Sequence, residues 1–479
     1  MGARGLPREG HRPASAARRL ALKALRAIDA EGAYANLALD RFLEGSHLSA
    51  ADRSLATELV YGVTRWRGRL DYVLDVLSTR PVGDLPVWIR NILRMGLYQL
   101  MYLDRVPARA AVAESVALAK EFGHQGTAAL VNAVMRKAAT APGDVGLPPA
   151  GPDPAARLTV EYSHPRWLVE RWLGRLGPER TCALLATNNE PAPLTLRTNV
   201  TRVSREELIA SLRAEGATAE PGRLWPESVI ARGVKPLRTL QSFSAGYFSV
   251  QDEGSMAAAR SLGPQPGWLV VDACAGVGGK ATHLAELMRD RGRVVAIDPF
   301  RHKLALLEQS ARRLGLTCIE TRSLDARDLP QSDLVGQADA VLVDAPCSGL
   351  GVLRRRPDLR WRLRESDIAD LASLQGELLR KASECVKPGG VLVYSTCTLE
   401  PEENGAVVEG FMDSRREFCL DDAARASGFD RTAGPADSES GPGPAPLRSG
   451  PHGAFLFFAP ESGGPDGFFV ARLVRTGCP

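Results

Sequence analysis

The sequence has 479 residues, of which 44% are hydrophobic and 24% charged, the balance of an ordinary globular protein and not of a disordered chain. This length predicts two or three domains with a substantial buried core. No apolar run is long enough to cross a bilayer, and the basic N-terminus lacks the apolar segment of a secretory signal. We therefore expect a cytoplasmic protein without membrane attachment. The net charge of +4 does not by itself identify a partner.

The cysteine spacing argues against a metal site. No two cysteines form a C-x-x-C pair, and the spacings match no zinc template, so we expect free thiols and no bound metal. In a reducing compartment most of them should lie in apolar surroundings. The eight cysteines are Cys182, Cys274, Cys318, Cys347, Cys385, Cys397, Cys419 and Cys478.

The first half of the chain predicts a helical domain and a small mixed one. Residues 1–15 form a basic tail that we expect to be disordered. Apolar residues at helical spacing over 16–140 predict an all-α domain. The Pro-, Gly- and Ala-rich stretch 141–156 is typical of a linker. Residues 157–250 mix helical and strand-like segments and predict a small α+β subdomain.

From Trp268 onward, apolar strands alternate with amphipathic helices, which is typical of a parallel sheet covered on both faces. We expect a Rossmann-like α/β domain over 251–479, interrupted by a flexible Gly/Pro/Ser-rich insertion at 424–450. The apolar segments 454–458 and 467–473 predict a hairpin on the edge of the sheet. The expected strands are 268–273, 293–297, 317–321, 340–343 and 390–395, and the expected helices are 280–289, 301–314, 366–386 and 403–411.

A glycine-rich turn follows the first of these strands and opens a helix. Glycines there let the backbone approach a ligand, although the turn alone is equally compatible with a dinucleotide site. An acidic residue then follows each of the next three strands, and the one after the second strand, Asp298, is placed to accept hydrogen bonds from both ribose hydroxyls. This ordered set is the layout of a class I methyltransferase that uses S-adenosylmethionine. Asp325 is equally well explained as a helix N-cap. The candidate cofactor-binding residues are Cys274, Ala275, Gly276, Val277, Gly278, Gly279, Lys280, Asp298, Asp325 and Asp344.

Two further stretches each follow an apolar strand, Asp-Ala-Pro-Cys-Ser-Gly at 344–349 and Ser-Thr-Cys-Thr at 395–398. Chemistry in an open parallel sheet gathers at the carboxyl ends of the strands, so Cys347 and Cys397 are candidates for a reaction centre. A thiol becomes a nucleophile once its pKa is lowered. Either cysteine alone would more often be a small buried apolar residue.

These two stretches resemble motifs IV and VI of RNA cytosine-C5 methyltransferases. Residues 251–256 resemble another signature of that family, and the helical domain, with Asp52-Arg53 and 58–62, resembles a NusB-type RNA-binding module. The combination is similar to the Sun/Fmu type, which methylates a cytosine of 16S ribosomal RNA. One departure is the turn 276–280, Gly-Val-Gly-Gly-Lys, where the family usually has Ala-Pro-Gly-Gly-Lys.

The resemblance assigns a role to each strand-end residue. It implies that Cys397 attacks carbon 6 of cytosine, that Asp344 stabilises the activated ring and that Cys347 assists release of the product. DNA cytosine methyltransferases instead use the cysteine of the Pro-Cys motif as the nucleophile, which leaves Cys347 as the rival. Two other functions stay open, a cytosine-C5 methyltransferase for another rRNA or tRNA site, and a non-catalytic RNA-binding factor in ribosome assembly.

A basic segment directly follows the Asp344 stretch and predicts contacts to RNA. Its arginines supply charge for phosphates and its tryptophan a surface for base stacking, although tryptophan is more often a core residue. We expect a monomer that binds small-subunit ribosomal RNA. The candidate RNA-binding residues are Arg354, Arg355, Arg356, Arg360, Trp361 and Arg362.

Overall fold

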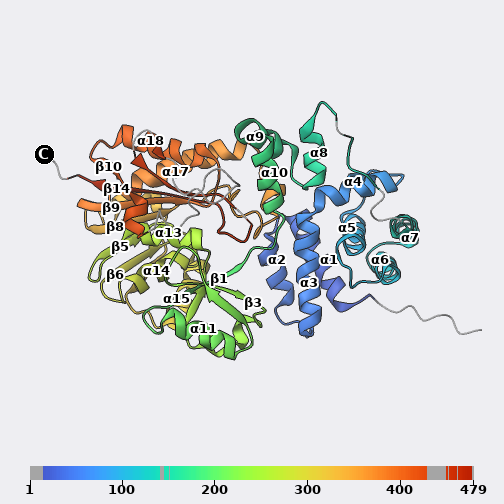
Figure 1. Ribbon diagram of the computed structural model, residues 1–479, viewed down its shortest axis with the longest axis horizontal. Helices are drawn as coiled ribbons and strands as arrows, with labels where there is room; N and C mark the ends of the chain where they lie inside the picture. The colour runs from blue at the N-terminus through green and yellow to red at the C-terminus, as the bar shows by residue number, and fades with distance from the viewer. Residues whose placement is uncertain are drawn as a thin grey trace, which may run out of the picture. The chain divides into compact units, whose positions relative to one another are not determined.

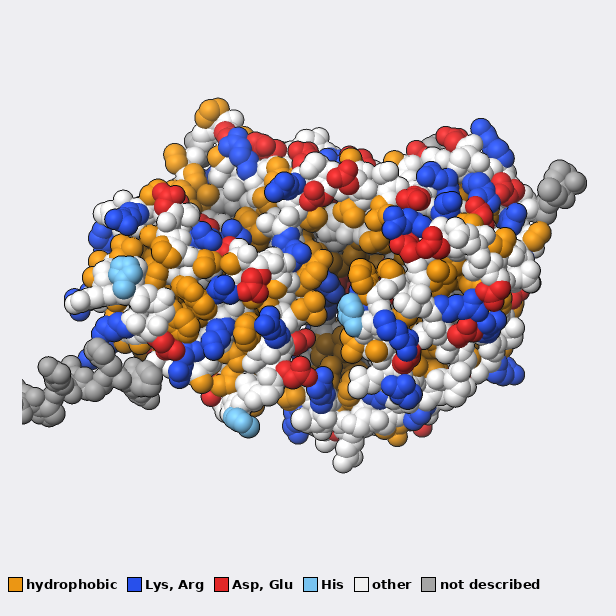
Figure 2. Space-filling view, turned by 180° about the vertical axis from the view of Figure 1, so that it is seen from behind, with side chains coloured by type: hydrophobic (Ala, Val, Ile, Leu, Met, Phe, Trp, Pro, Cys, Tyr) orange, Lys and Arg blue, Asp and Glu red, His pale blue; other side chains and the backbone are white. Residues whose placement is uncertain are grey.

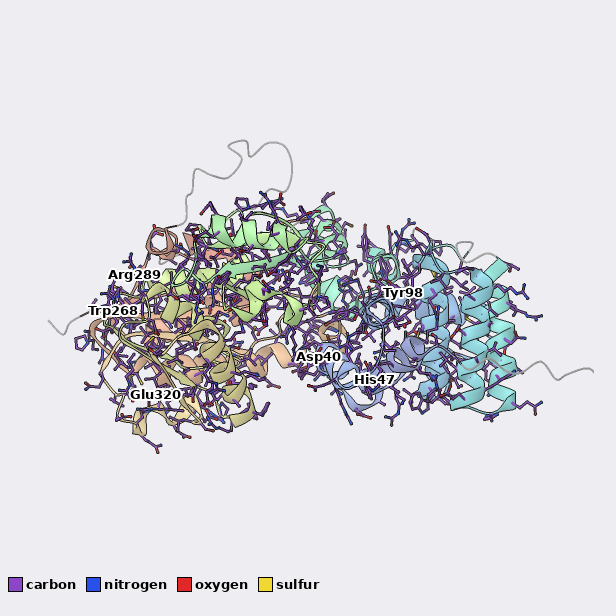
Figure 3. All side chains as sticks on the ribbon, turned by 90° about the horizontal axis from the view of Figure 1, so that it is seen from below. Asp40, His47, Tyr98, Trp268, Arg289 and Glu320 are labelled. Carbon is purple, nitrogen blue, oxygen red and sulfur yellow. The ribbon has the colours of Figure 1, made fainter. Side chains whose placement is uncertain are left out.

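The computed structural model describes residues 14–140, 145–149, 151–428, 449–450, 453–460 and 462–476. The predicted disordered tail 1–15 and flexible insertion 424–450 lie mostly outside these residues. The chain divides into two compact units, Met1–Asn189 with Leu353–Leu363, and Glu190–Val352 with Arg364–Pro479. In Figure 3, Tyr98 lies among the helices of the first unit, whereas Trp268, Arg289 and Glu320 belong to the second.

The first unit is helical, which confirms the predicted all-α domain (Figure 1). Its third helix begins after Ser49, because Ser49 Oγ accepts a hydrogen bond from the Asp52 backbone N–H at 3.1 Å and caps the helix. The helices are α1 Ala16–Glu31, α2 Ala35–Leu43, α3 Ala50–Arg65, α4 Arg67–Leu77, α5 Val87–Tyr102, α6 Ala108–Phe122, α7 Gln125–Thr140, α8 Pro154–Glu161, α9 Arg166–Leu176, α10 Pro178–Thr187 and, from the later segment, α16 Leu359–Arg362, with the 3-10 turn η1 Val82–Asp84.

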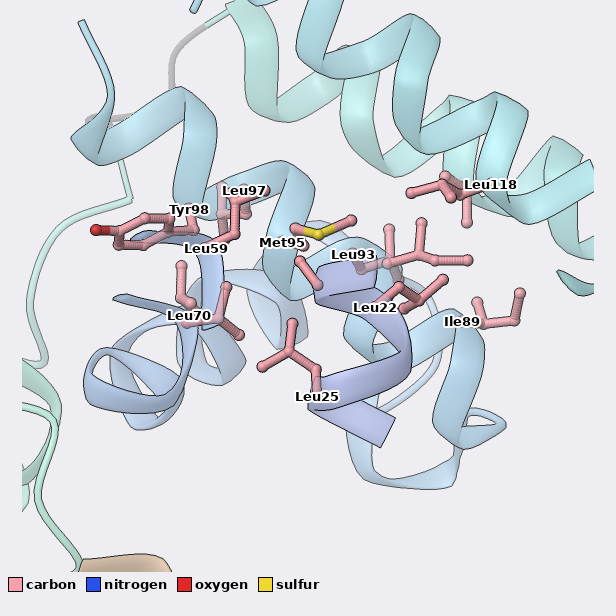
Figure 4. Packing of buried hydrophobic residues seen from close by; sticks show 14 of the residues in the cluster. Leu22, Leu25, Leu59, Leu70, Ile89, Leu93, Met95, Leu97, Tyr98 and Leu118 are labelled. Atoms are coloured by element: carbon pink, nitrogen blue, oxygen red, sulfur yellow. The ribbon is translucent and has the colours of Figure 1, made fainter. Parts of the chain in front are cut away.

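Apolar stripes of α1, α3, α5, α6 and α7 form the core of this unit, as Figure 4 shows for the side chains from Leu22 to Leu118. The contact between α3 and α5 depends on Gly62. A Cβ atom there would lie 2.1 Å from Tyr98 Cζ, so only glycine allows the tyrosine ring to pack against the α3 backbone. The hydroxyl of Tyr98 donates to Glu58 Oε1 at 2.5 Å, which satisfies the polar end of the buried ring.

The second unit opens with a small antiparallel sheet of order β2-β3-β1-β4. Ser204 and Glu207 form a capping box at the start of α11, the helix packed against it. The predicted α+β subdomain is therefore present, but the helices over 157–187 pack in the first unit. The elements are β1 Leu194–Thr198, α11 Arg205–Ala214, β2 Thr218–Pro221, β3 Ser228–Arg232, η2 Leu237–Thr239, α12 Gln241–Ser244 and β4 Phe248–Val250.

The main sheet has the order β10-β14-β9-β8-β5-β6-β7. The five strands from β7 across to β9 are parallel, and β14 runs antiparallel to both of its neighbours. The elements are α13 Glu253–Leu262, β5 Leu269–Asp272, α14 Gly279–Leu287, β6 Arg293–Ile297, α15 Arg301–Leu314, β7 Ile319–Arg322, η3 Ala326–Gln331, β8 Ala338–Asp344, α17 Ser366–Ser383, β9 Val386–Thr396, η4 Pro401–Glu403, α18 Gly405–Ser414, β10 Phe418–Asp421, α19 Ala423–Ser427, β11 Ser449–Gly450, β12 Gly453–Ala454, β13 Leu456–Phe458 and β14 Phe468–Arg475.

Neighbouring residues of β5 enter different cores, because successive side chains of a strand point to opposite faces. Val270 belongs to the core with Leu284 of α14, and Val271 to the core with Leu379 of α17. The sheet is thus covered on both faces, as predicted. Figure 2 shows charges of both signs interspersed over one face of the molecule. Within the described residues, no helix is both long and apolar enough to span a bilayer.

The C-terminal segments form the predicted hairpin at the sheet edge, but only one of its two strands is an edge strand. Strands β13 and β14 do pair antiparallel, with Leu456 opposite Val470, but β14 lies between β9 and β10 and is not the edge strand. Val470 and Ala471 are fully buried although they point to opposite faces, as is typical of an interior strand. Beyond β14 the edge is formed by β13 along residues 468–470 and by the short β10 along residues 472–475.

Candidate active site

The two cysteine-bearing stretches lie side by side at the carboxyl ends of neighbouring strands of the main sheet. Strands β8 and β9 pair in parallel with Asp344 opposite Ser395, so the loops that follow them start from adjacent positions. Two backbone hydrogen bonds extend this pairing beyond the strands. Ala345 N–H donates to Ser395 O at 3.0 Å, and Gly351 N–H donates to Cys397 O at 3.0 Å.

The two sulfurs are in contact, with 3.3 Å between Cys347 Sγ and Cys397 Sγ. The backbone N–H of Cys397 also points to Cys347 Sγ, at 3.3 Å. The hydrogen bond with Cys397, together with burial, raises the pKa of the Cys347 thiol well above its ordinary value. The structure thus brings together the two thiols that the sequence singles out.

Asp344 is held by both of its carboxylate oxygens. Oδ2 lies 2.5 Å from Lys280 Nζ, and Oδ1 accepts a hydrogen bond from Ser395 Oγ at 2.9 Å. The Lys280 ammonium also lies 5.0 Å from the centre of the Phe468 ring, within range of a cation–π contact. Lys280 therefore reaches the candidate catalytic carboxylate across the glycine turn, and it fixes how that carboxylate faces the site.

The glycine turn after β5 wraps around Asp298. Gly276 N–H donates to Asp298 Oδ2 at 3.1 Å, and Phe300 N–H donates to Asp298 Oδ1 at 2.9 Å. Gly278 has a φ of +88°, and a Cβ atom there would lie 2.3 Å from Leu307 Cγ. This position requires glycine both for its backbone angle and for the close packing of α15.

Asp272, which is not among the predicted cofactor residues, ends β5 at the base of this turn. Its carboxylate is buried, and neither oxygen has a side-chain partner among the described residues. Burial and the nearby negative charge of Asp344 raise its pKa to about 7. A buried carboxylate without a partner fits a ligand that brings positive charge to this end of the sheet. Asp272 could have been found in the sequence as the acidic residue directly before the glycine turn.

Asp325 caps the 3-10 turn η3. One carboxylate oxygen accepts from the backbone N–H of Arg327 at 2.9 Å, and the other lies 2.8 Å from the Arg327 guanidinium. The hydrogen bond from Arg327 lowers the pKa of this carboxyl. The N-cap role considered from the sequence is thus observed, and a role in adenine binding stays a prediction.

A buried salt bridge holds the helix that follows the glycine turn. The guanidinium of Arg197, on β1, makes two 2.8 Å contacts to the carboxylate of Glu286, and it donates to the backbone oxygen of Gly279 at 2.7 Å. Both side chains are almost completely buried. This ion pair links α14 to the small antiparallel sheet, so the subdomain stabilises the glycine turn.

A second carboxylate that the sequence analysis missed lies behind the two cysteine loops. Glu403, in η4, is fully buried and accepts hydrogen bonds from Ser348, Thr398 and Gln375. In the sequence it is one of two adjacent glutamates in a polar turn, and nothing local distinguishes it from its exposed neighbour Glu402.

The predicted RNA-binding segment requires a correction. Arg354 and Arg360 are buried, and the guanidinium of Arg360 donates to the backbone oxygens of Ser163 and Asn188, both at 3.1 Å. In this structure those two arginines pack within the first unit, and RNA binding by the segment stays a prediction.

The tryptophan of this segment is also tied into the helical unit. Trp361 is half-buried and donates its indole N–H to Thr64 O at 2.7 Å. Arg355 is half-buried as well. Arg356 and Arg362 are exposed, so they are the residues of this segment that stay candidates for phosphate contact.

Three further cysteines, Cys274, Cys318 and Cys385, lie outside the pair at the site. Burial raises the pKa of Cys318 and of Cys385 to about 12, which favours their neutral forms. Burial raises the pKa of Cys274 as well. Over the described part of the chain, no group of three or more His, Cys, Asp or Glu side chains is arranged to hold a metal ion.

A parallel sheet with a glycine turn after its first strand, acidic residues after the next ones and an antiparallel β14 defines the class of protein. This is the Rossmann-like fold of class I S-adenosylmethionine-dependent methyltransferases. The family described as 16S rRNA methyltransferase RsmB/F matches residues 259–474, the NusB family matches 15–140, and the RsmF/B-like ferredoxin-like domain matches 164–236.

Known relatives extend over nearly the whole chain. A probable ribosomal RNA small subunit methyltransferase B from Bacillus subtilis is 40% identical over 84% of this chain and 89% of its own length. The probable enzyme of that name from Synechocystis is 38% identical over 96% and 99%. The chain belongs to the RsmB/F family of 16S rRNA methyltransferases.

Solved structures agree with this assignment. The crystal structure of PH0851 covers 95% of this chain and 98% of its own, with a TM-score of 0.78 and 28% identity. NSun6 from Pyrococcus horikoshii, solved with SFG, covers 66% of this chain and 99% of its own, with a TM-score of 0.55 and 25% identity.

Proposed function

We propose that the protein transfers a methyl group from S-adenosylmethionine to carbon 5 of a cytosine in 16S ribosomal RNA, through a covalent cysteine–pyrimidine intermediate. The observation that carries the proposal is the contact between Cys347 and Cys397 beside a carboxylate, Asp344, that is bound at both oxygens. The names of the relatives supply the ribosomal RNA substrate, and the NusB match over 15–140 supports RNA as the partner.

The residues explain how an unreactive carbon becomes a nucleophile. Carbon 5 of cytosine gains electron density only when the Cys397 thiolate adds to carbon 6 and the ring becomes an enamine. Asp344 hydrogen-bonds the protonated ring nitrogen and stabilises this electron-rich adduct. Lys280 and Ser395 hold the Asp344 carboxylate in one orientation, so little reorganisation is needed at the moment of reaction.

The cofactor fits the strand ends. When bound, S-adenosylmethionine supplies the methyl group of its sulfonium. Asp298, which accepts the Gly276 N–H, is the candidate acceptor for the ribose hydroxyls, and the positive φ of Gly276 and Gly278 supports a close approach of the turn to the ligand. The buried Asp272 carboxylate favours a positively charged ligand over a neutral one. Asp325 is the candidate for the adenine amino group.

The product must then leave Cys397. A base removes the proton from carbon 5, the bond between Cys397 Sγ and carbon 6 breaks, and its electron pair returns to the sulfur. We assign Cys347 to this release step, because its sulfur touches that of Cys397 and the resemblance gives the attack to the cysteine of the 395–398 stretch.

Trapping on RNA that contains 5-fluorocytosine tests the assignment, because fluorine at carbon 5 cannot be removed as a proton and the adduct persists. Cys397→Ala should abolish both methylation and trapping, while Cys347→Ala should still trap. The exposed Cys419 offers a control, and Cys419→Ala should behave as the unmodified enzyme. Trapping by Cys397→Ala but not by Cys347→Ala would exchange the roles of the two cysteines.

Two further measurements address the rival functions. Calorimetry should show binding of S-adenosylmethionine, whereas a non-catalytic assembly factor would show none. Bisulfite sequencing of ribosomal RNA from a deletion strain should reveal one 16S cytosine that has lost its methyl group. A change in transfer RNA instead would place the activity on another substrate.

A further inference from the structure

A single buried carboxylate connects the loops that carry the two cysteines. Glu403 Oε2 accepts the backbone N–H of Ser348 at 2.8 Å, and Glu403 Oε1 accepts the hydroxyls of Ser348 at 2.5 Å and of Thr398 at 3.1 Å. Ser348 directly follows Cys347, and Thr398 directly follows Cys397. The two hydroxyl oxygens are themselves 2.7 Å apart. One side chain therefore contacts the residue after each thiol.

The surrounding structure holds Glu403 in this position. Gln375 of α17 donates to Glu403 Oε2 and to Pro346 O, both at 2.9 Å, so a helix of the sheet's outer layer braces the carboxylate and the Cys347 loop together. The hydroxyl of Tyr394, on β9, donates to Glu403 O at 2.6 Å. Glu403 and Ser348 are 0% and 1% exposed, so water does not replace these contacts. A buried carboxylate is stable only with such a set of donors.

The charge of Glu403 acts on the Cys347 thiol. Negative groups face Cys347 from Cys397 when that thiol is ionised and from Glu403, and both oppose a second negative charge on the Cys347 sulfur. The Cys397 backbone N–H acts in the other direction, because it donates to Cys347 Sγ. Tyr394 responds to the same surroundings, since burial and the charges of Cys347, Glu403 and Asp344 raise the pKa of its phenol. Lys280, a cation of the site, is paired with Asp344.

We propose that Glu403 is a positioning residue for the methyl-transfer site, which holds the two sulfurs in contact and opposes a negative charge on Cys347. In the proposed function Cys397 is the attacking sulfur, and Cys347 then lies next to the bond that must later break. The inference rests on the proposed function and adds the group that links the loops of the two thiols.

Glu403→Gln tests it, because the amide keeps the length of the side chain and removes its charge. We expect kcat to fall 10- to 100-fold with KM for S-adenosylmethionine changed less than twofold. The alkylation of each cysteine by iodoacetamide, followed against pH by mass spectrometry of its peptide, should show the Cys347 midpoint moving to lower pH. Glu402→Gln removes the same charge one residue away at an exposed position and should change none of these values.

Ser348→Ala with Thr398→Val provides a second test if Glu403→Gln does not fold, because it removes the hydroxyl links and leaves the carboxylate. We expect this double variant to lose at least tenfold in kcat. A folded Glu403→Gln enzyme with unchanged kcat would overturn the proposal. A lower kcat with an unmoved Cys347 midpoint would also overturn it, because Glu403 would then act through folding alone. Alkylation is measured without RNA, so failure of the proposed RNA chemistry is a separate result.

Discussion

Lys280 Nζ lies 2.5 Å from Asp344 Oδ2 and so joins the glycine turn after β5 to the end of β8. Lys280 belongs to the glycine turn, which is assigned to cofactor binding. Asp344 belongs to the 344–349 stretch, which is assigned to the target cytosine. Their side chains are only 12% and 29% exposed, so the pair is screened less than a surface ion pair. The orientation of Asp344 therefore depends on the glycine turn after β5, the proposed site of the cofactor.

Loss of this pair should slow the reaction more than it weakens folding. We expect Lys280→Met to lower kcat/KM for RNA about 10- to 100-fold, which corresponds to about 1.4–2.7 kcal/mol of transition-state stabilisation. Lys387→Met is the control, because Lys387 forms a more exposed ion pair with Asp339 near the start of the same strand. Steady-state kinetics with a 16S RNA fragment measures both. Equal activity of the two variants would contradict a role for Lys280 at the site.

The buried Asp272 should make the stability of the cofactor-free protein depend on pH. Its pKa is about 7 in the fold, above the ordinary value of 3.8, so the folded state prefers the protonated carboxyl. The resulting penalty is absent below about pH 4, grows as the pH rises to about 7 and is constant above it. Asp272→Asn should therefore raise the free energy of unfolding at pH 8 by about 2–4 kcal/mol and have little effect at pH 4.

Thermal unfolding at both pH values measures this difference. If a positively charged ligand offsets the buried carboxylate, S-adenosylmethionine should raise the Tm of Asp272→Asn less than that of the unmodified protein. S-adenosylhomocysteine lacks the sulfonium charge, so it should raise the Tm of the two proteins by more similar amounts. A stability gain that is the same at pH 4 and pH 8 would show that packing, and not ionisation, separates the two proteins.

The arginines of the segment after β8 should divide into two groups. Arg360→Gln should lower the free energy of unfolding by about 3 kcal/mol, because it leaves buried backbone oxygens of Ser163 and Asn188 without their donor. Arg356→Gln, at an exposed position, should leave stability unchanged and reduce the salt slope of RNA binding by about 1. Urea unfolding and RNA titration at several salt concentrations measure the two effects. An unchanged salt slope would remove Arg356 from the RNA surface.

This division shows where prediction from sequence ends. The places of Asp344, Cys347 and Cys397 follow from local information, since each comes directly after an apolar strand and parallel strands present their ends at one edge. The burial of Arg360 depends on Ser163, 197 residues earlier in the chain, and a run of arginines looks the same whether exposed or buried. Long-range contacts of this kind leave no periodic pattern.

The same limit applies to elements and to single acids. The apolar segment of β14 is predictable as a strand, but its insertion between β9 and β10 depends on the edge strand β10, which has only four residues, Phe418–Asp421. Glu403 and Glu402 are equivalent in the sequence and differ only after η4 turns one of them inward. Burial, not residue type, makes Glu403 a candidate for function.

Two glycines of the cofactor turn provide a matched pair for the last prediction. Both have positive φ, but a Cβ at Gly278 would lie 2.3 Å from Leu307 Cγ, whereas a Cβ at Gly276 meets no atom of the described structure within 4 Å. Gly276→Ala should thus cost only backbone strain, about 1 kcal/mol, and Gly278→Ala must also displace α15. We expect Gly278→Ala to weaken S-adenosylmethionine binding at least tenfold more than Gly276→Ala, measured by calorimetry. The reverse order would mean that the ligand, and not Leu307, occupies the space beside the turn.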